Sequence, residues 1–243
     1  SAPSPVSVVL AGVVIKVSGA YAAMRVFRDV FLNDAALGNV MLVLGLGSIV
    51  VGALGALGQR DYKRMLAFSS VSQIGYILMG AATGSAIGFL GAVLHFFNHA
   101  TFKSLLFTGA AAILHKTGTR DMDRMGGLAQ KMPVTGTGSV IALLSMAGVP
   151  PLSGFWSKLL VIIAVWRVSV PLAAMALLAS ALTMGYFMVI QQKVFFGQPA
   201  EGMEDVTEDR SLAFVQVLLS ALNVIVGVAF PFLLIYLNGI GLL

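Results

Sequence analysis

Three polar side chains recur one helical turn apart in the stretch LHFFNHATFKSLLF. His95, His99 and Lys103 are spaced i, i+4 and i+8, which places them on one face of a helix. A polar stripe on an otherwise apolar helix is expected to face the protein interior. Because histidine titrates near neutral pH and lysine can give up its proton when buried, the stripe indicates a proton path.

Two other interpretations of the histidine pair stay open. Two histidines one turn apart could share a zinc ion, but the sequence offers no cysteine and no glutamate in an HExxH pattern as further ligands. We therefore expect no metal site. In the other interpretation, both histidines are hydrogen-bonded core residues that hold neighbouring helices together.

Two more lysines interrupt apolar stretches. Lys16 lies about ten residues into the first apolar segment, at mid-membrane depth, where a lone lysine costs about 2.5–3.5 kcal/mol on insertion scales. Lys158 lies in the first turn of an apolar segment that follows a run of prolines. All ten acids, in contrast, lie in loops or at helix ends. The lack of buried carboxylates argues against a sodium site made by this chain alone, because hard cations prefer oxygen ligands.

The segment Val134–Val168 cannot be one regular helix. Its middle holds two prolines between glycines, at Gly148, Pro150, Pro151 and Gly154. Proline lacks an N–H and clashes with the carbonyl four residues back, so we expect a helix, an unwound break and a second helix. A break and a lysine at membrane depth together indicate an ion pathway. The alternative is a re-entrant kink whose lysine extends to the membrane interface.

The composition is that of an integral membrane protein. Hydrophobic residues make up 58% of the 243 residues and charged residues 10%, with a mean hydropathy of +0.94, whereas soluble domains carry about 25% charged residues. The absence of cysteine excludes disulfides and thiolate chemistry. The net charge of +5 is spread over short loops, so we expect no nucleic-acid partner.

The predicted fold is all-α: a single polytopic membrane domain over residues 1–243, with about seven transmembrane helices, one of them discontinuous. Asp61 is expected to cap the third helix. The longest linker, 196–210, holds five of the ten acids and is expected to be a solvated loop. The predicted spans are residues 6–24, 40–57, 65–82, 87–114, 134–168 with the break at 148–154, 171–195 and 212–238.

Basic residues predict the orientation. The loops on the side of the N-terminus hold nine Lys and Arg, and the loops on the other side hold three. The positive-inside rule therefore predicts a cytoplasmic N-terminus and an outside C-terminus. We expect a multi-pass protein of the cell (or energy-transducing) inner membrane.

Five stretches, in this order, resemble the antiporter-like membrane subunits shared by respiratory complex I, group 4 membrane-bound hydrogenases and Mrp Na+/H+ antiporters: SPVSVVLAGVVIKVSGAY, QRDYKRMLAFSSVSQIGY, HFFNHATFKSLLF, TRDMDRMGGLAQKMP and GVPPLSGFWSK. The resemblance implies that Lys16, Lys103 and Lys158 are proton-relay lysines and that His95 and His99 connect them. It also implies that the break belongs to the discontinuous helix of the second inverted repeat.

The resemblance covers only part of a usual family member, which carries two such repeats. The residues here correspond to the last helix of the first repeat, the whole second repeat and a final helix. We therefore expect either a fragment of a longer subunit, or a split subunit with other membrane subunits as partners, including a chain that supplies the first repeat and brings a carboxylate near Lys16.

The sequence thus predicts a proton-translocating, antiporter-like subunit of an energy-converting membrane complex of the complex I or hydrogenase type. We expect no redox site, flavin, quinone, iron–sulfur cluster or other cofactor in this chain, so any oxidoreductase activity would belong to the complex as a whole. A subunit of a multisubunit Na+/H+ antiporter without a redox partner, and a non-conducting membrane scaffold, stay open as alternatives. The three buried lysines argue against the scaffold.

Overall fold

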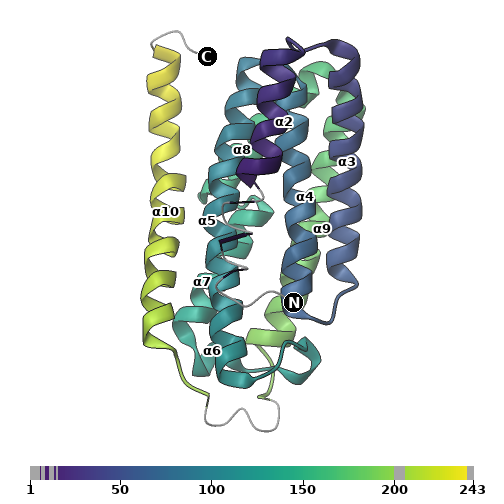
Figure 1. Cartoon of the computed structure of the whole chain (residues 1–243). Helices are drawn as coiled ribbons and strands as arrows, with labels where there is room; N and C mark the ends of the chain where they lie inside the picture. Colours follow the sequence, from purple (N-terminus) through teal and green to yellow (C-terminus); the bar gives the residue numbers. More distant parts are fainter. Residues whose placement is uncertain (1–5, 7–8, 11–13, 15, 200–205, 240–243) are drawn as a thin grey trace.

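The computed structural model describes residues 6, 9–10, 14, 16–199 and 206–239 (Figure 1). Within these residues all regular elements are helical, apart from an isolated antiparallel bridge between Asp61 and Asp121. The prediction of an all-α membrane fold is confirmed. The helical elements, in chain order, are η2 (Lys16–Tyr21), α2 (Ala22–Arg25), η3 (Val26–Val30), α3 (Ala35–Leu57), α4 (Tyr62–Ala82), α5 (Ala86–Thr117), η4 (Met122–Arg124), α6 (Leu128–Lys131), α7 (Pro133–Ala147), α8 (Ser153–Val168), α9 (Val170–Ile190), η5 (Gln191–Phe195) and α10 (Arg210–Gly239).

Among the described residues, four helical segments are long and apolar enough to cross a membrane: Ala35–Leu57, Tyr62–Ala82, Val170–Phe195 and Arg210–Leu237. Helix α5 is longer, with 32 residues, but its apolar character is interrupted by polar side chains. Helices α7 and α8, with 15 and 16 residues, are each shorter than the roughly 20 residues that a plain span requires. The count of about seven spans therefore stays a prediction.

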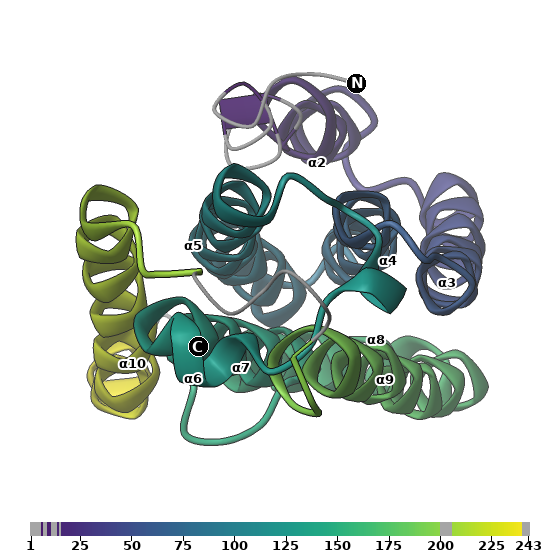
Figure 2. The ribbon, with the colours of Figure 1, turned by 90° about the horizontal axis from the view of Figure 1, so that it is seen from below.

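The helices form two rows when the bundle is viewed from one end (Figure 2). Helices α3, α4 and α5 lie in one row, and α7, α8 and α9 lie in the other; α8 contacts α4, α5 and α9. Helix α10 stands at one edge, against α5, α7 and α8. The α3–α4 and α5–α7 connections lie together at the lower end in Figure 1. This arrangement places α5 and α8, which carry the predicted site residues, in the middle of the bundle.

Side-chain caps mark several helix starts. Asp61 accepts a hydrogen bond from the Arg64 amide at 2.9 Å, which confirms its predicted capping role. Asp34 caps α3 in the same way, so α3 begins at Ala35, before the predicted boundary. The first predicted span also continues as helical turns through Val30.

Helix α7 ends in a glycine cap. Gly148 has φ +86°, its amide bonds the Ser145 carbonyl at 3.0 Å, and the Val149 amide bonds the Leu144 carbonyl at 3.0 Å, a Schellman arrangement that only glycine adopts without strain. A turn follows, with Leu152 N bonded to Val149 O at 3.1 Å.

Helix α8 begins at Ser153, so Gly154 lies in its first turn and not in the break. The early start also places Lys158 in the second turn of α8, not in the first turn as predicted. Gly154 packs so closely on α7 that a Cβ there would lie 1.9 Å from the Ser145 carbonyl oxygen. Its own amide bonds Ser145 Oγ at 3.0 Å. The two arms of the discontinuous segment are therefore joined by direct backbone contact.

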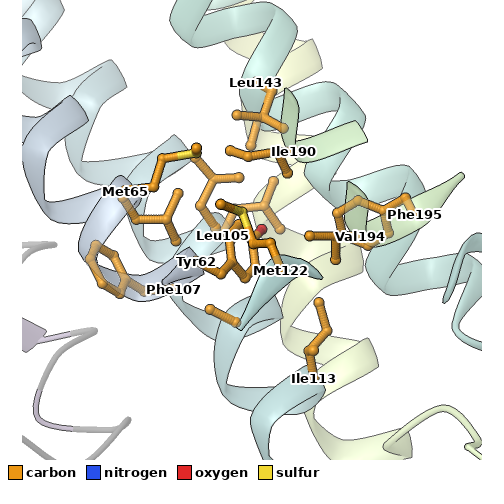
Figure 3. Packing of buried hydrophobic residues seen from close by; sticks show 14 of the residues in the cluster. Tyr62, Met65, Leu105, Phe107, Ile113, Met122, Leu143, Ile190, Val194 and Phe195 are labelled. Atoms are coloured by element: carbon orange, nitrogen blue, oxygen red, sulfur yellow. The ribbon is translucent and has the colours of Figure 1, made fainter. Parts of the chain in front are cut away.

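The largest apolar cluster joins the two rows of helices (Figure 3). Met65 from α4, Leu105 from α5, Leu143 from α7 and Ile190 from α9 are all buried in it. Within a membrane such a cluster stabilises the fold through close van der Waals packing, since lipid tails are as apolar as these side chains.

The acidic linker is only partly the solvated loop that the sequence predicts. Glu208 accepts hydrogen bonds from Val134 N at 2.9 Å and Thr135 Oγ1 at 2.5 Å. It therefore caps α7 from a distant part of the chain, where the amides of the first turn lack helix partners.

Candidate functional site

Four predicted relay residues lie inside the bundle. His95, His99 and Lys103 on α5 and Lys158 on α8 are all buried. The fifth, Lys16, belongs to η2, but its side chain lies outside the described residues. The buried residues described include these two lysines but no aspartate or glutamate. The site therefore combines lysines with neutral polar side chains.

Lys103 connects α5 to α4. Its Nζ donates to the Leu66 carbonyl oxygen at 2.8 Å and to Ser69 Oγ at 2.5 Å. Short hydrogen bonds from an ammonium group are the usual way to offset its burial. Lys103 is therefore held at one end of the polar stripe.

The two histidines stack along the same helix face. Their ring centroids are 6.4 Å apart with planes inclined by 19°. Phe102 lies edge-on to His99, with centroids 5.3 Å apart. Both histidines also make further contacts in the structure.

His95 contacts Ser157 on α8, and Asn98 on α5 shares this contact. The sequence singled out neither Ser157 nor Asn98. The His95 Nδ1 lies 2.9 Å from Ser157 Oγ, and Asn98 Nδ2 lies 3.1 Å from the same oxygen. Asn98 also donates to the Ser153 carbonyl at 2.7 Å. Asn98 is three residues from His95, so helical spacing alone could have placed it on the stripe.

Tyr76 on α4 joins His95 to Lys158. The Lys158 Nζ lies 4.5 Å from the centroid of the Tyr76 ring, a cation–π distance, and the His95 ring lies 5.9 Å away edge-on. The Tyr76 hydroxyl is fixed by the Ala176 carbonyl at 2.9 Å and by Ser180 Oγ at 2.7 Å. Among the described residues, Lys158 Nζ has no hydrogen-bond partner, so the ring face is its principal contact.

The break lies beside Lys158. A methyl group built on Gly148 would lie 3.1 Å from Lys158 Cδ, so the glycine leaves room for the lysine stem. Pro150 and Pro151 are exposed in the turn between the arms. The geometry thus brings the predicted break and the predicted lysine together.

The arrangement gathers proton-binding and hydrogen-bonding side chains in one buried line. From Lys103 through His99 and His95 to Tyr76 and Lys158, the line runs along three helices inside the bundle. Each member can carry, donate or accept a proton or a hydrogen bond. Ser69 and Ser157 adjoin the line through Lys103 and His95, and Ser72, Gln73 and Thr183 are further buried polar side chains of the bundle.

Comparisons with known proteins place the chain among membrane subunits. Residues 1–183 match the family described as NADH:quinone oxidoreductase/Mrp antiporter, TM. Hydrogenase-4 component B of Escherichia coli (strain K12) is 33% identical, over 94% of this chain and 38% of that protein. NADH-quinone oxidoreductase subunit N of Desulforudis audaxviator is 39% identical, over 82% of this chain and 41% of that protein.

A solved structure of the Mrp complex from Dietzia sp. DQ12-45-1b superposes on this chain with a TM-score of 0.88 and 26% identity, over 95% of this chain and 51% of that one. The chain therefore spans about half the length, or less, of these relatives.

Proposed function

The chain belongs to the membrane-subunit family of NADH:quinone oxidoreductases and Mrp antiporters, and from that premise we propose that it translocates protons as an antiporter-like subunit of an energy-converting membrane complex. Family membership confirms the resemblance drawn from the sequence motifs. The related proteins are components of a hydrogenase, of an NADH-quinone oxidoreductase and of Na+/H+ antiporters.

The observation that carries the proposal is the buried line from Lys103 to Lys158. Burying two lysines in a bundle core costs free energy, and lysines at such positions commonly mark ion pathways. Here two stacked histidines and Tyr76 lie between them. A proton added at one lysine disfavours the charged form of a protonated neighbour. The neighbour is therefore more ready to release its own proton to the next group. Lys103 would take up the proton, the histidines would pass it on, and Lys158 would be the terminal relay beside the break.

The source of the proton is proposed to lie outside the second repeat. Because the chain spans about half the length of its relatives or less, a first repeat from another chain or from a longer subunit would face Lys16 and bring a carboxylate to it. A redox module or an ion-exchange module elsewhere in the complex would drive the cycle. The end of the bundle with the basic α3–α4 and α5–α7 connections would face the cytoplasm.

A Na+/H+ antiporter without a redox partner is the second candidate, and the superposition on the Mrp complex favours it. The same buried line would serve both functions. The two differ in the drive: an antiporter exchanges protons for sodium ions and is driven by the gradient of one of them, whereas a redox-coupled pump needs an electron donor and acceptor.

The test is proton transport by the assembled complex in proteoliposomes. Lys103→Met should abolish transport, because it removes the proton-binding group from the line. Lys116→Met, on an exposed lysine in the last turn of the same helix, should leave transport near the wild-type rate. Equal transport by both variants would overturn the proposal and favour the scaffold.

A further inference from the structure

Ser157 on α8 contacts three polar groups with one hydroxyl. Its Oγ lies 3.0 Å from the Gly154 carbonyl oxygen, 3.1 Å from Asn98 Nδ2 and 2.9 Å from His95 Nδ1. A hydroxyl group has one proton to donate and two lone pairs that accept. All three contacts are satisfied together only if two partners donate and one accepts.

The orientation of the Asn98 amide follows from a fourth contact. Its Nδ2 lies 2.7 Å from the carbonyl oxygen of Ser153, an atom that can only accept. With the amide turned over, two oxygens would face each other at that distance, so the group that points at α8 is the NH2 group. Asn98 therefore donates to Ser157 and occupies its first lone pair.

The remaining two contacts then have one solution. The Gly154 carbonyl can only accept, so it takes the Ser157 proton, and His95 Nδ1 must donate to the second lone pair. We infer that Ser157, held by Asn98 and Gly154, fixes neutral His95 in the tautomer that is protonated on Nδ1, so that His95 exchanges protons through Nε2. Ser157 is thereby a positioning residue that acts through His95.

The position of these groups links the histidine to the break. Ser153, Gly154 and Ser157 occupy the first two turns of α8, directly after the break. A shift of this segment would move the Ser157 oxygen away from His95 and release the tautomer. This consequence for transport rests on the proposed function, whereas the tautomer itself does not.

The direct test is solid-state NMR on the complex, labelled with 13C,15N-histidine, at a pH where the ring is neutral. Subtracting the spectrum of a His95→Gln complex isolates the His95 signals. We expect the shifts of a ring protonated on Nδ1 and unprotonated on Nε2. A ring protonated on Nε2, as would result if Ser157 donated to Nδ1, overturns the inference.

Three variants test the role of Ser157. Ser157→Ala should give both tautomers and lower transport several-fold, whereas Ser157→Thr keeps the hydroxyl and should keep the single tautomer and most of the transport. Ser48→Ala removes a half-buried hydroxyl that bonds within α3. It should change neither the His95 tautomer nor the transport rate.

A Ser157→Ala complex that keeps the single tautomer would overturn the role of Ser157. If the ring is protonated on Nδ1 but His95→Gln leaves transport unchanged, the proposed function fails while the inference about the tautomer stands.

Discussion

The indole nitrogen of Trp156 donates a hydrogen bond of 2.8 Å to the carbonyl oxygen of Gly227. In a regular helix that carbonyl accepts from the amide four residues later, which here belongs to Pro231, and proline has no N–H. A carbonyl without a partner is costly in a membrane. The tryptophan on α8 therefore satisfies the group that the proline leaves open on α10.

This relationship predicts a coupling between two substitutions. Trp156→Phe should destabilise the protein by about 1 kcal/mol, the usual net value of a hydrogen bond. In a Pro231→Ala background the cost should be smaller, because the alanine amide can bond the Gly227 carbonyl within α10. The measurement is a double-mutant cycle on unfolding in detergent.

Trp166→Phe is the matched control for this cycle, since Trp166 lies on the same helix but is half exposed. It should show no coupling to Pro231→Ala. Additive effects of the Trp156 and Pro231 substitutions would contradict the interpretation.

A second prediction concerns the junction of the two arms. Gly154→Ala would place a Cβ 1.9 Å from the Ser145 carbonyl oxygen and 2.7 Å from its carbon. Because both are backbone atoms, α8 must move away, at a cost of about 1–3 kcal/mol or more. Thermal unfolding in detergent should show the loss. In contrast, Gly47→Ala should be neutral or stabilising, because its added Cβ would meet no atom within 4 Å beyond the local backbone of its own helix. Equal thermal stability of the two variants would argue against a rigid junction.

The sequence predicted the parts of the site that are visible within one segment. A lysine in an apolar run, or two prolines inside a span, conflicts with its own neighbours, so Lys158 and the break stood out. Tyr76, Asn98 and Ser157 did not, because tyrosine, asparagine and serine are unremarkable in a helix until a distant helix supplies their partner. Their roles come from the packing of α4 and α8 on α5, which local patterns do not encode.

The same distinction holds for the fold. The helices and their apolar character follow from composition and periodicity, and Asp61 could be predicted as a cap because its partner is three residues away. Glu208 could not, since the helix that it caps begins more than seventy residues earlier in the chain.

A third prediction concerns pH at the end of the bundle with the basic loops. The hydrogen bond from Lys193 holds the pKa of Asp123 below its ordinary value of 3.8, with a further contribution from Arg60, 3.7 Å away. Because the folded pKa is the lower one, the contact stabilises the fold above the ordinary carboxyl pKa and is lost as the pH falls through the folded value. Asp123→Asn should therefore lower the melting temperature at neutral pH but not in strong acid. A constant difference between the two proteins from neutral to acidic pH would count against this contact.

A fourth prediction concerns the histidine pair. His95→Gln and His99→Gln should each lower proton transport while assembly stays intact, because glutamine forms hydrogen bonds but cannot titrate. The measurements are transport in proteoliposomes and co-purification of the subunits. Normal transport with both histidines replaced would show that they are structural. Stoichiometric zinc that is lost on substitution would favour the metal interpretation instead.

The fifth prediction concerns Lys158, whose ammonium group lies 4.5 Å from the centre of the Tyr76 ring. Lys158→Ala should abolish transport without preventing assembly, because removing a buried cation relieves a desolvation cost. Tyr76→Phe keeps the ring face and is the matched control for the cation–π contact. It should preserve assembly and lower transport less than Lys158→Ala does.

The chemistry of the replacement decides between titration and positive charge as the role of Lys158. Lys158→Arg keeps a cation but should fail, because the guanidinium effectively never loses its proton. Lys158→Glu loses the cation but keeps a titratable group, so it should retain part of the transport. Both are measured as proton uptake by proteoliposomes that contain the complete complex, with assembly verified separately. Full transport by Lys158→Arg would show that a fixed positive charge suffices, and full transport by Lys158→Ala would remove the residue from the path.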